Sequence, residues 1–184
     1  MMTKKVFLLC GIPASGKSTW AQNFLEESYD ENYLITYISR DAIRLSLLKD
    51  GEDYFAHETR VWWQFVEDCV TGIEDNDIII IDQTNLNWAS RRKIIKAIQN
   101  KISKTCKYEI IPVYFLTDYD TCIKRNSKRE GRRRVPEYQM KRMRDSFTHP
   151  EFDPFHYSTL ITVVDDSVNR FPSKVEDADD ELAF

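Results

Sequence analysis

The chain has 184 residues, a formal net charge of −4 at pH 7 and a pI of about 5.5. This length is typical of one domain that buries roughly two thirds of its surface around one core. The acidic balance excludes a uniformly basic nucleic-acid-binding surface, so a site for a polyanion must be a local patch. No stretch approaches the ~18 continuous apolar residues of a membrane span, and the start of the chain lacks the apolar length of a signal peptide.

Strands and helices are predicted to alternate along residues 6–164. Strands are expected over 6–10, 34–39, 77–82, 108–116 and 159–164, which are apolar or rich in β-branched residues. Helices are expected over 18–24, 41–48, 54–72, 88–101, 118–128 and 136–147. Pro112 lacks an N–H donor and favours an edge position or a bulge for its strand. The alternation predicts an α/β fold with a mostly parallel five-stranded sheet covered by helices on both faces.

The residues that follow the first predicted strand have the spacing G-x-x-x-x-G-K-[ST]. Its glycines permit turns that direct backbone N–H groups at phosphate oxygens, and the helix that opens near Gly16 adds its positive end. Lys17 is expected at the β- and γ-phosphates, and Ser18 at Mg²⁺. A chance match is the weaker alternative, because strand, loop and helix signals occur in the required order. The nucleotide-binding residues are predicted to be Gly11, Pro13, Ala14, Ser15, Gly16, Lys17, Ser18 and Thr19.

Polar residues follow the second and third predicted strands, and ligands of α/β folds bind at the carboxyl ends of strands. The second strand leads to Arg40, Asp41 and Arg44, and the third to Asp82, Thr84 and Asn85, and these six residues are predicted to bind the acceptor. Asp41 is placed to accept the proton of an acceptor hydroxyl during phosphoryl transfer, although it would serve equally as a helix cap. Arg44 lies one helical turn later and can hold an anionic group. Asp82 either holds Mg²⁺ through water or orients Arg44.

A basic segment covers residues 124–134, where seven of eleven residues are basic and one is acidic. Gly131 gives this segment a flexible point, as expected of a lid that closes arginines over a triphosphate and excludes water. The alternative is an ordinary solvated surface, which fits poorly with a chain that is acidic overall. Lys141, Arg142 and Arg144 extend the positive field and suit an acceptor with several phosphates.

The pair Trp62-Trp63 lies in the predicted helix 54–72. We interpret it as core plus a groove wall, because apolar residues recur around it at helical spacing. A platform on which bases stack is the alternative.

With these motifs in order, the chain resembles the kinase domain of the phage-type polynucleotide 5′-hydroxyl kinases, within the P-loop phosphotransferases. The resemblance covers about residues 4–148 and rests on GIPASGKSTW at 11–20, Arg40-Asp41-x-x-Arg44, Asp82-x-Thr84-Asn85-Leu86-Asn87 with Arg91-Arg92, and Arg125-Asn126-Ser127-Lys128-Arg129 with Val135-Pro136. It implies ATP as the donor, Mg²⁺ as the cofactor and the 5′-hydroxyl end of DNA or RNA as the acceptor.

The resemblance also implies roles for single residues. Lys17 and Ser18 would hold the ATP phosphates and Mg²⁺, and Asp41 would be the general base. Arg44 would bind the phosphate on the 3′ side of the acceptor nucleoside, oriented by Asp82. Arg129, together with Arg125, would reach from the basic segment to the transferring phosphates and belong to the ATP site.

The chain departs from the family pattern at three places, one of which is the segment after Arg129, which is more basic than the family requires. Gln83 adds a residue between Asp82 and Thr84, which changes the expected turn. Family members often carry a 3′-phosphatase domain with the motif D-x-D-G-[ST], which Asp165-Asp166-Ser167 does not fit, so we expect no 3′-phosphatase activity. We expect a kinase domain over 1–166 and an acidic tail over 167–184. The tail is either disordered or a peptide that docks a partner or the basic segment.

Two other functions stay open at this level. A P-loop kinase of a small-molecule hydroxyl, such as a metabolite, antibiotic or sugar nucleotide, would share the phosphate loop but would not need the basic segment. A nucleotide-dependent switch or motor is weaker, since the chain has no N-K-x-D guanine-reading motif. The scattered cysteines favour a cytoplasmic protein, phage-encoded or otherwise, with no membrane partner. The sequence leaves the oligomeric state open, a homo-oligomer included.

Overall fold

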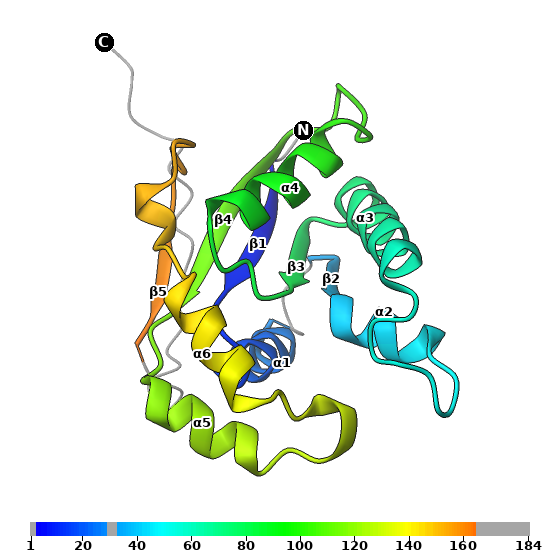
Figure 1. The fold of residues 1–184 in the computed structure, drawn as a ribbon. Coiled ribbons are helices and arrows are strands. Elements are labelled where there is room, and N and C mark those ends of the chain that lie inside the picture. The colour runs from blue at the N-terminus through cyan, green and yellow to red at the C-terminus, as the bar shows by residue number, and fades with distance from the viewer. Residues whose placement is uncertain (1–2, 29–32, 165–184) are drawn as a thin grey trace.

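The computed structural model describes residues 3–28 and 33–164. In this part of the chain five parallel strands form one sheet in the order β2-β3-β1-β4-β5 (Figure 1). The strands are β1 (Lys4–Cys10), β2 (Ile35–Ser39), β3 (Ile78–Asp82), β4 (Tyr108–Phe115) and β5 (Ile161–Val163). The helices are α1 (Lys17–Glu27), α2 (Arg40–Leu47), α3 (Glu58–Asp75), α4 (Trp88–Gln99), α5 (Tyr119–Ser127) and α6 (Glu137–Asp145), with 3₁₀ turns at Gly131–Arg133 and Pro150–Phe152. The predicted α/β fold is confirmed.

Helices cover both faces of the sheet because alternate side chains of each strand point to opposite sides. In β3, Ile79 and Ile81 pack against α3 and α4, whereas Ile78 and Ile80 pack with α1. A smaller cluster joins α5 and α6 to Ile12, in the loop after β1, so these two helices lie at the carboxyl ends of the strands (Figure 1). The sheet therefore presents its carboxyl edge to the segment that contains the predicted site residues.

Helix α3 begins and ends later than predicted. Asp53 Oδ1 accepts a hydrogen bond from the Phe55 backbone N–H (2.8 Å), and this turn occupies the first residues expected to be helical. The predicted end at Gly72 is wrong as well. Gly72 lies inside α3, where an added Cβ would meet Ile38 of β2 at 2.9 Å. The glycine therefore permits close contact between helix and sheet instead of ending the helix.

The prediction for Pro112 needs correction. β4 is an interior strand between β1 and β5, with Pro112 opposite Leu8 of β1. In the described chain, however, β5 pairs with β4 only from Val113 to Phe115. Pro112 thus lies just before the second ladder starts, where the local environment resembles that of an edge strand.

Arg91 of α4 points into the interior, unlike Arg92 beside it, which is exposed. Its side chain is fully buried and forms a bidentate ion pair with Asp153, with N–O distances of 2.5 and 2.6 Å. Tyr157 also donates to Asp153 (2.9 Å), and Arg91 donates to the backbone oxygen of Asn85 (2.9 Å). This buried network connects α4 to the segment that leads into β5.

The proposed acidic tail and the Asp165–Ser167 comparison lie outside the described residues. Among the residues that the structure does describe, no helix is long and apolar enough to cross a membrane.

Candidate active site

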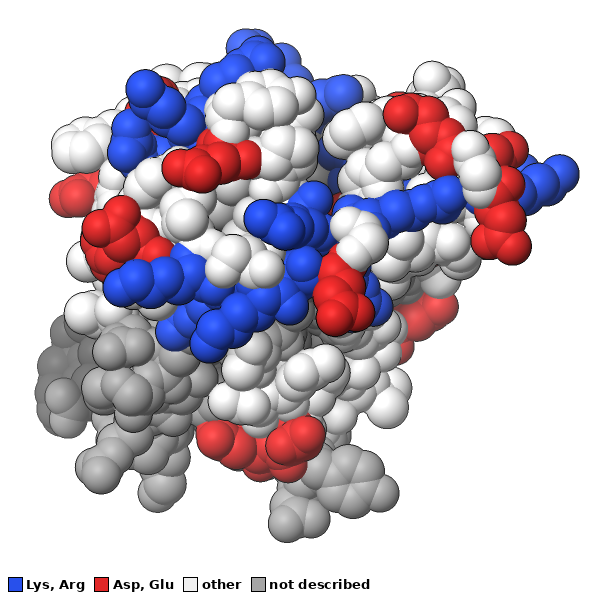
Figure 2. All heavy atoms as spheres, turned by 60° about the horizontal axis from the view of Figure 1, so that its bottom comes forward, with Lys and Arg blue, Asp and Glu red and all other residues white. Residues whose placement is uncertain are grey.

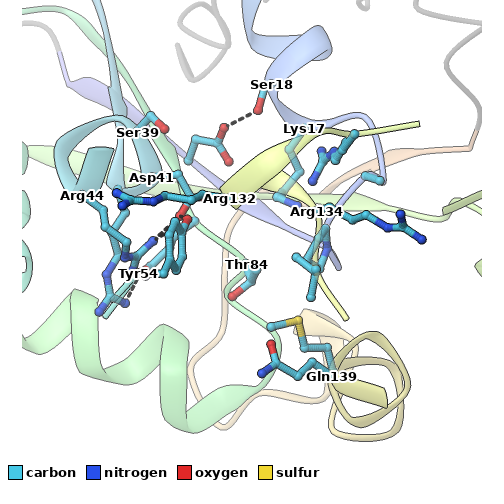
Figure 3. A pocket seen from close by; sticks show the side chains of 18 of the residues that line it. Lys17, Ser18, Ser39, Asp41, Arg44, Tyr54, Thr84, Arg132, Arg134 and Gln139 are labelled. Carbon is cyan, nitrogen blue, oxygen red and sulfur yellow. Dashed lines mark hydrogen bonds and ion pairs between the residues drawn. The ribbon is translucent and has the colours of Figure 1, made fainter. Parts of the chain in front are cut away.

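A pocket of about 700 Å³ opens at the carboxyl edge of the sheet. It is lined by three groups of residues: the phosphate loop and the start of α1, the turns and helices around Asp41, and the basic segment with α6. Figure 3 shows these groups facing one another across the pocket. Members of the predicted site that line it are Pro13, Ala14, Gly16, Lys17, Ser18, Thr19, Arg40, Asp41, Arg44, Asp82, Thr84, Arg125 and Arg129.

The phosphate loop obtains its shape from two residues with positive φ. Gly16 has φ 98° at the N-cap of α1, where no side chain provides a cap, and Ala14 has φ 64°. Such values are costly for residues with a Cβ, so the shape of the turn favours glycine at 16. The first N–H groups of α1 consequently face the pocket without a side-chain cap and can bind an anion.

Two predicted nucleotide-binding residues do not line the pocket. The Gly11 N–H donates to the backbone oxygen of Thr84 (3.0 Å), and Ser15 is buried with its N–H directed at Ile12 O (3.3 Å). Both residues hold the loop in shape, and Gly11 fastens it to the turn after β3.

Lys17 lies over the phosphate loop, with Nζ donating to the backbone oxygens of Gly11 (2.9 Å) and Ile12 (2.8 Å). Burial lowers the pKa of Lys17, since removal from water penalises its charged form. The carboxylates of Asp82 and Asp41 oppose this decrease of the pKa, whereas the charge of Arg129 adds to it. Charged groups from the other two parts of the pocket, the part around Asp41 and the basic segment, therefore act on the pKa of Lys17.

Ser18 and Asp82 form an oxygen-rich corner at the start of α1. The Ser18 hydroxyl donates to Asp82 Oδ2 (2.8 Å), and the hydroxyl of Tyr37 donates to the same oxygen (2.5 Å) (Figure 3 draws the Ser18 bond). Hydroxyl and carboxylate oxygens are the ligands that Mg²⁺ prefers, and Mg²⁺ in nucleotide sites is held by few protein groups together with phosphates. The donor set at this corner fits Mg²⁺. The prediction that Asp82 orients Arg44 is wrong, because the contacts of Asp82 are with Ser18 and Tyr37.

Asp41 is the second residue of α2 and does not cap it. The cap is Ser39, whose side chain accepts from the Ala42 N–H (3.3 Å). The Asp41 side chain is 73% exposed and points into the pocket (Figure 3). The structure therefore excludes the interpretation of Asp41 as the cap of α2.

Arg44 is buried and held from several sides. It pairs with Asp41 and with Glu58, whose Oε1 accepts from Nε (2.9 Å) and Nη2 (2.6 Å). Its guanidinium lies over the rings of Tyr54 (4.8 Å) and Phe55 (5.5 Å). The Tyr54 hydroxyl also donates to Asp41 (3.1 Å). Sequence reasoning missed Glu58, Tyr54 and Phe55, because the α2–α3 connection and the start of α3 carry no recognisable motif.

Glu58 also binds Arg40, through Oε2 at 2.7 Å. Arg40 reaches Gln83 on its other side (3.3 Å). The additional residue in the turn after β3 therefore contacts the α2 side of the pocket. Glu58 thus bridges the two arginines that follow β2.

The prediction that Asn85 binds the acceptor is wrong. Asn85 is buried, lies outside the pocket and has φ 43°. Its Nδ2 donates to Leu9 O (2.8 Å) and its Oδ1 accepts from Gln83 (2.5 Å). The side chain fastens the turn after β3 to β1, which is a structural role.

The basic segment covers the pocket with arginines. Arg125, Arg129, Arg132 and Arg134 line it, with Gln139 and Met143 of α6 beside them. Arg132 reaches across to the backbone oxygen of Lys49, which follows α2 (3.3 Å). Lysine and arginine side chains gather across this face of the molecule, with acidic side chains around and between them (Figure 2).

The tryptophans of α3 do not line the pocket, so the expected groove wall is not found there. Trp62 packs on the core beneath Arg40 and Lys93, as the core interpretation requires. Trp63 is exposed, with Lys101 over its ring (5.4 Å).

Residues 6–150 match the family model AAA_33, described as an AAA domain. The chain belongs to this family. The family match covers the phosphate loop Gly11–Thr19, and both identify a P-loop nucleotide-binding domain. No further function follows from family membership alone.

Three similar proteins have names that refer to different substrates or assemblies. An L-seryl-tRNA(Sec) kinase from Methanococcus maripaludis is 24% identical over 79% of this chain and 53% of its own length. A chain of the Pnkp1/Rnl/Hen1 RNA repair complex shares the fold with a TM-score of 0.64 and 22% identity, over 79% of this chain and 44% of that one. A gluconokinase from Sinorhizobium meliloti 1021 shares it with a TM-score of 0.51 and 13% identity, over 89% and 83%. The chain thus spans about half the length of the first two.

Proposed function

We propose that this protein transfers the γ-phosphoryl group of ATP to the 5′-hydroxyl end of DNA or RNA. The observation that carries the proposal is one pocket with three walls. The phosphate loop forms the donor side, Asp41 and Arg44 the acceptor side, and four arginines of the basic segment cover both. A phosphotransferase needs this combination of donor cradle, base and covering cations.

The chemistry assigned to the acceptor side is proton removal. The acceptor hydroxyl oxygen attacks the γ-phosphorus, its proton passes to the exposed carboxylate of Asp41, and the bond from phosphorus to the β,γ-bridging oxygen breaks to leave ADP. Mg²⁺, when bound, supplies charge neutralisation at the β- and γ-phosphates. Lys17 and Arg129 supply positive charge from the protein to the same phosphates.

A nucleic-acid acceptor accounts for the amount of positive charge at the pocket. Arg132 and Arg134 lie beyond the residues that a triphosphate donor requires, and Lys141, Arg142 and Arg144 continue the positive field along α6. In a chain of net charge −4, such a local concentration favours a polyanion. Two similar proteins have names that refer to RNA, an L-seryl-tRNA(Sec) kinase and a member of an RNA repair complex, and these names support a nucleic-acid acceptor.

One observation favours a small-molecule acceptor as the second candidate. Arg44 is already paired with Glu58 and Asp41, which lowers its need for an anionic ligand. A neutral polyol could then occupy the acceptor side, as the name of the gluconokinase neighbour illustrates.

The deciding experiment is a phosphoryl-transfer assay with Mg²⁺ and labelled ATP. Acceptors offered in parallel are 5′-hydroxyl DNA, 5′-hydroxyl RNA, a nucleoside 3′-phosphate, and a set of sugars and nucleosides without phosphate. We expect label on the 5′-hydroxyl acceptors and none on oligonucleotides that already carry a 5′-phosphate. Asp41→Asn should abolish transfer while ADP binding is retained. Label on the unphosphorylated small molecules alone would overturn the proposal in favour of the second candidate.

A further inference from the structure

Tyr37 is a half-buried tyrosine of β2 that no motif includes, although its hydroxyl bonds to Asp82, which lines the nucleotide side of the pocket. It lies opposite Ile80 of β3, two residues before Ser39, which lies opposite Asp82. Residues two apart in a strand point to the same face. Tyr37 and Asp82 therefore both lie on the face of the sheet that α1 covers, and Ser18 lies at the start of that helix.

One carboxylate oxygen receives two hydroxyl groups at this corner. Asp82 Oδ2 accepts from Tyr37 (2.5 Å) and from Ser18 (2.8 Å). The three groups come from β2, β3 and α1, so the contact connects three elements at the point where the donor phosphates are expected. The Tyr37 bond is short for a bond between a hydroxyl and a carboxylate oxygen, and the Ser18 bond has the ordinary length.

We propose that Tyr37 is a positioning residue for Mg²⁺ in the nucleotide site. Its hydroxyl holds the Asp82 carboxylate in the orientation in which Asp82 accepts the Ser18 proton, so the lone pairs of the Ser18 oxygen remain directed at the pocket. A partner that orients a ligand in this way commonly changes metal affinity by about 10- to 100-fold when it is removed. Tyr37 does not contact the nucleotide or the acceptor, and its effect passes entirely through Asp82.

The alternative is that Tyr37 only fills space between β2 and α1. Its ring packs at the edge of the core cluster that contains Trp20 and Ile80. Tyr37→Phe separates the two roles, because it retains the ring and removes only the hydroxyl.

The test measures binding of ADP to the full chain by titration calorimetry, across a series of Mg²⁺ concentrations and in EDTA. In Tyr37→Phe we expect the Mg²⁺ concentration for half-maximal enhancement of ADP binding to rise by about 10- to 100-fold. The affinity for ADP in EDTA should stay at the wild-type value. Tyr108→Phe is the matched control, since Tyr108 is also a partly buried strand tyrosine but lies at the opposite end of the sheet. It should leave both quantities unchanged.

A double-mutant cycle tests whether the hydroxyl acts through Asp82. In an Asp82→Asn background, Tyr37→Phe should produce no further change in the Mg²⁺ dependence. The proposal is overturned if Tyr37→Phe leaves the Mg²⁺ dependence unaltered, if it shifts that dependence equally in both backgrounds, or if it weakens ADP binding in EDTA by the same factor.

The inference rests on the nucleotide half of the proposed function alone. The readout contains no acceptor, so failure of the polynucleotide proposal would appear separately, in the transfer assay.

Discussion

Glu58 organises the acceptor side of the pocket at the level of a single side chain. Its two oxygens bind Arg44 and Arg40, the two arginines of α2. Hydrogen bonds to charged groups contribute about 1.5–3 kcal/mol, more than those between neutral groups. Arg44 is buried, so removal of the Glu58 carboxylate would leave the guanidinium with only Asp41 to balance its charge.

Glu58→Gln should therefore disturb acceptor binding and leave donor binding intact. We expect KM for a 5′-hydroxyl oligonucleotide to rise about tenfold or more, the lower bound of the hydrogen-bond range above. ADP affinity should not change. Steady-state kinetics and calorimetry measure the two quantities. Glu67→Gln, on an exposed position of the same helix, is the control. Equal losses in donor and acceptor binding would contradict the assignment.

The basic segment and α6 act together as an element that covers the pocket. Asn126 of α5 binds Val135 in both directions, donating to its oxygen (2.7 Å) and accepting from its N–H (3.0 Å). This pair closes the loop that carries residues 128–134. Within that loop, Arg132 and Arg134 line the pocket, whereas Arg133 does not.

Arg132 and Arg134 are expected to bind phosphates of the acceptor. Changing both to alanine should weaken single-stranded oligonucleotide binding and reduce its salt dependence. The slope of log K against log salt should fall by about 0.7 for each phosphate that the protein no longer neutralises. Fluorescence anisotropy at several salt concentrations measures this slope. Arg133→Ala removes a neighbouring exposed charge of the same type. If Arg133→Ala reduces the slope by half as much as the double change or more, the pocket itself does not bind the acceptor phosphates.

At the scale of the whole molecule, the Arg91–Asp153 pair fastens the end of the described chain to its centre. Arg91 lies in α4 on one face of the sheet, and Asp153 follows the 3₁₀ turn that leads toward β5. Both side chains are almost completely inaccessible to solvent. Removing one member of such a pair leaves a buried charge, which costs about 3–5 kcal/mol.

Asp153→Ala should consequently lower the melting temperature by about 6–20 °C. Thermal unfolding followed by circular dichroism measures it. Asp145→Ala breaks the exposed pair between Arg144 and Asp145 and should cost less than about 1 kcal/mol. Arg91→Met combined with Asp153→Ala should destabilise the protein by less than the two single changes added together. Additive losses would show that the two charges do not depend on each other.

The sequence by itself determined the features that depend on local spacing. The phosphate loop needs one strand, one turn and one helix in succession, and the order of strands and helices follows from periodicity of 2 or 3.6 residues. These patterns predicted the α/β fold, the loop from Gly11 to Thr19 and the presence of Asp41 beside it. The limits of α3 were misplaced, because a local turn at Asp53 and a close contact between Gly72 and β2 override propensity there.

The tertiary structure decided which polar side chains meet. Asp82 bonds to Ser18, 64 positions away in the chain, and to Tyr37, 45 positions away, and not to Arg44. Asn85 turns inward to β1, and Arg91 is buried against a residue 62 positions later. No local pattern contains such pairs, since they depend on the order of strands in the sheet and on the face to which each side chain points. The sequence thus identifies the nucleotide loop, and packing assigns the partners that surround it.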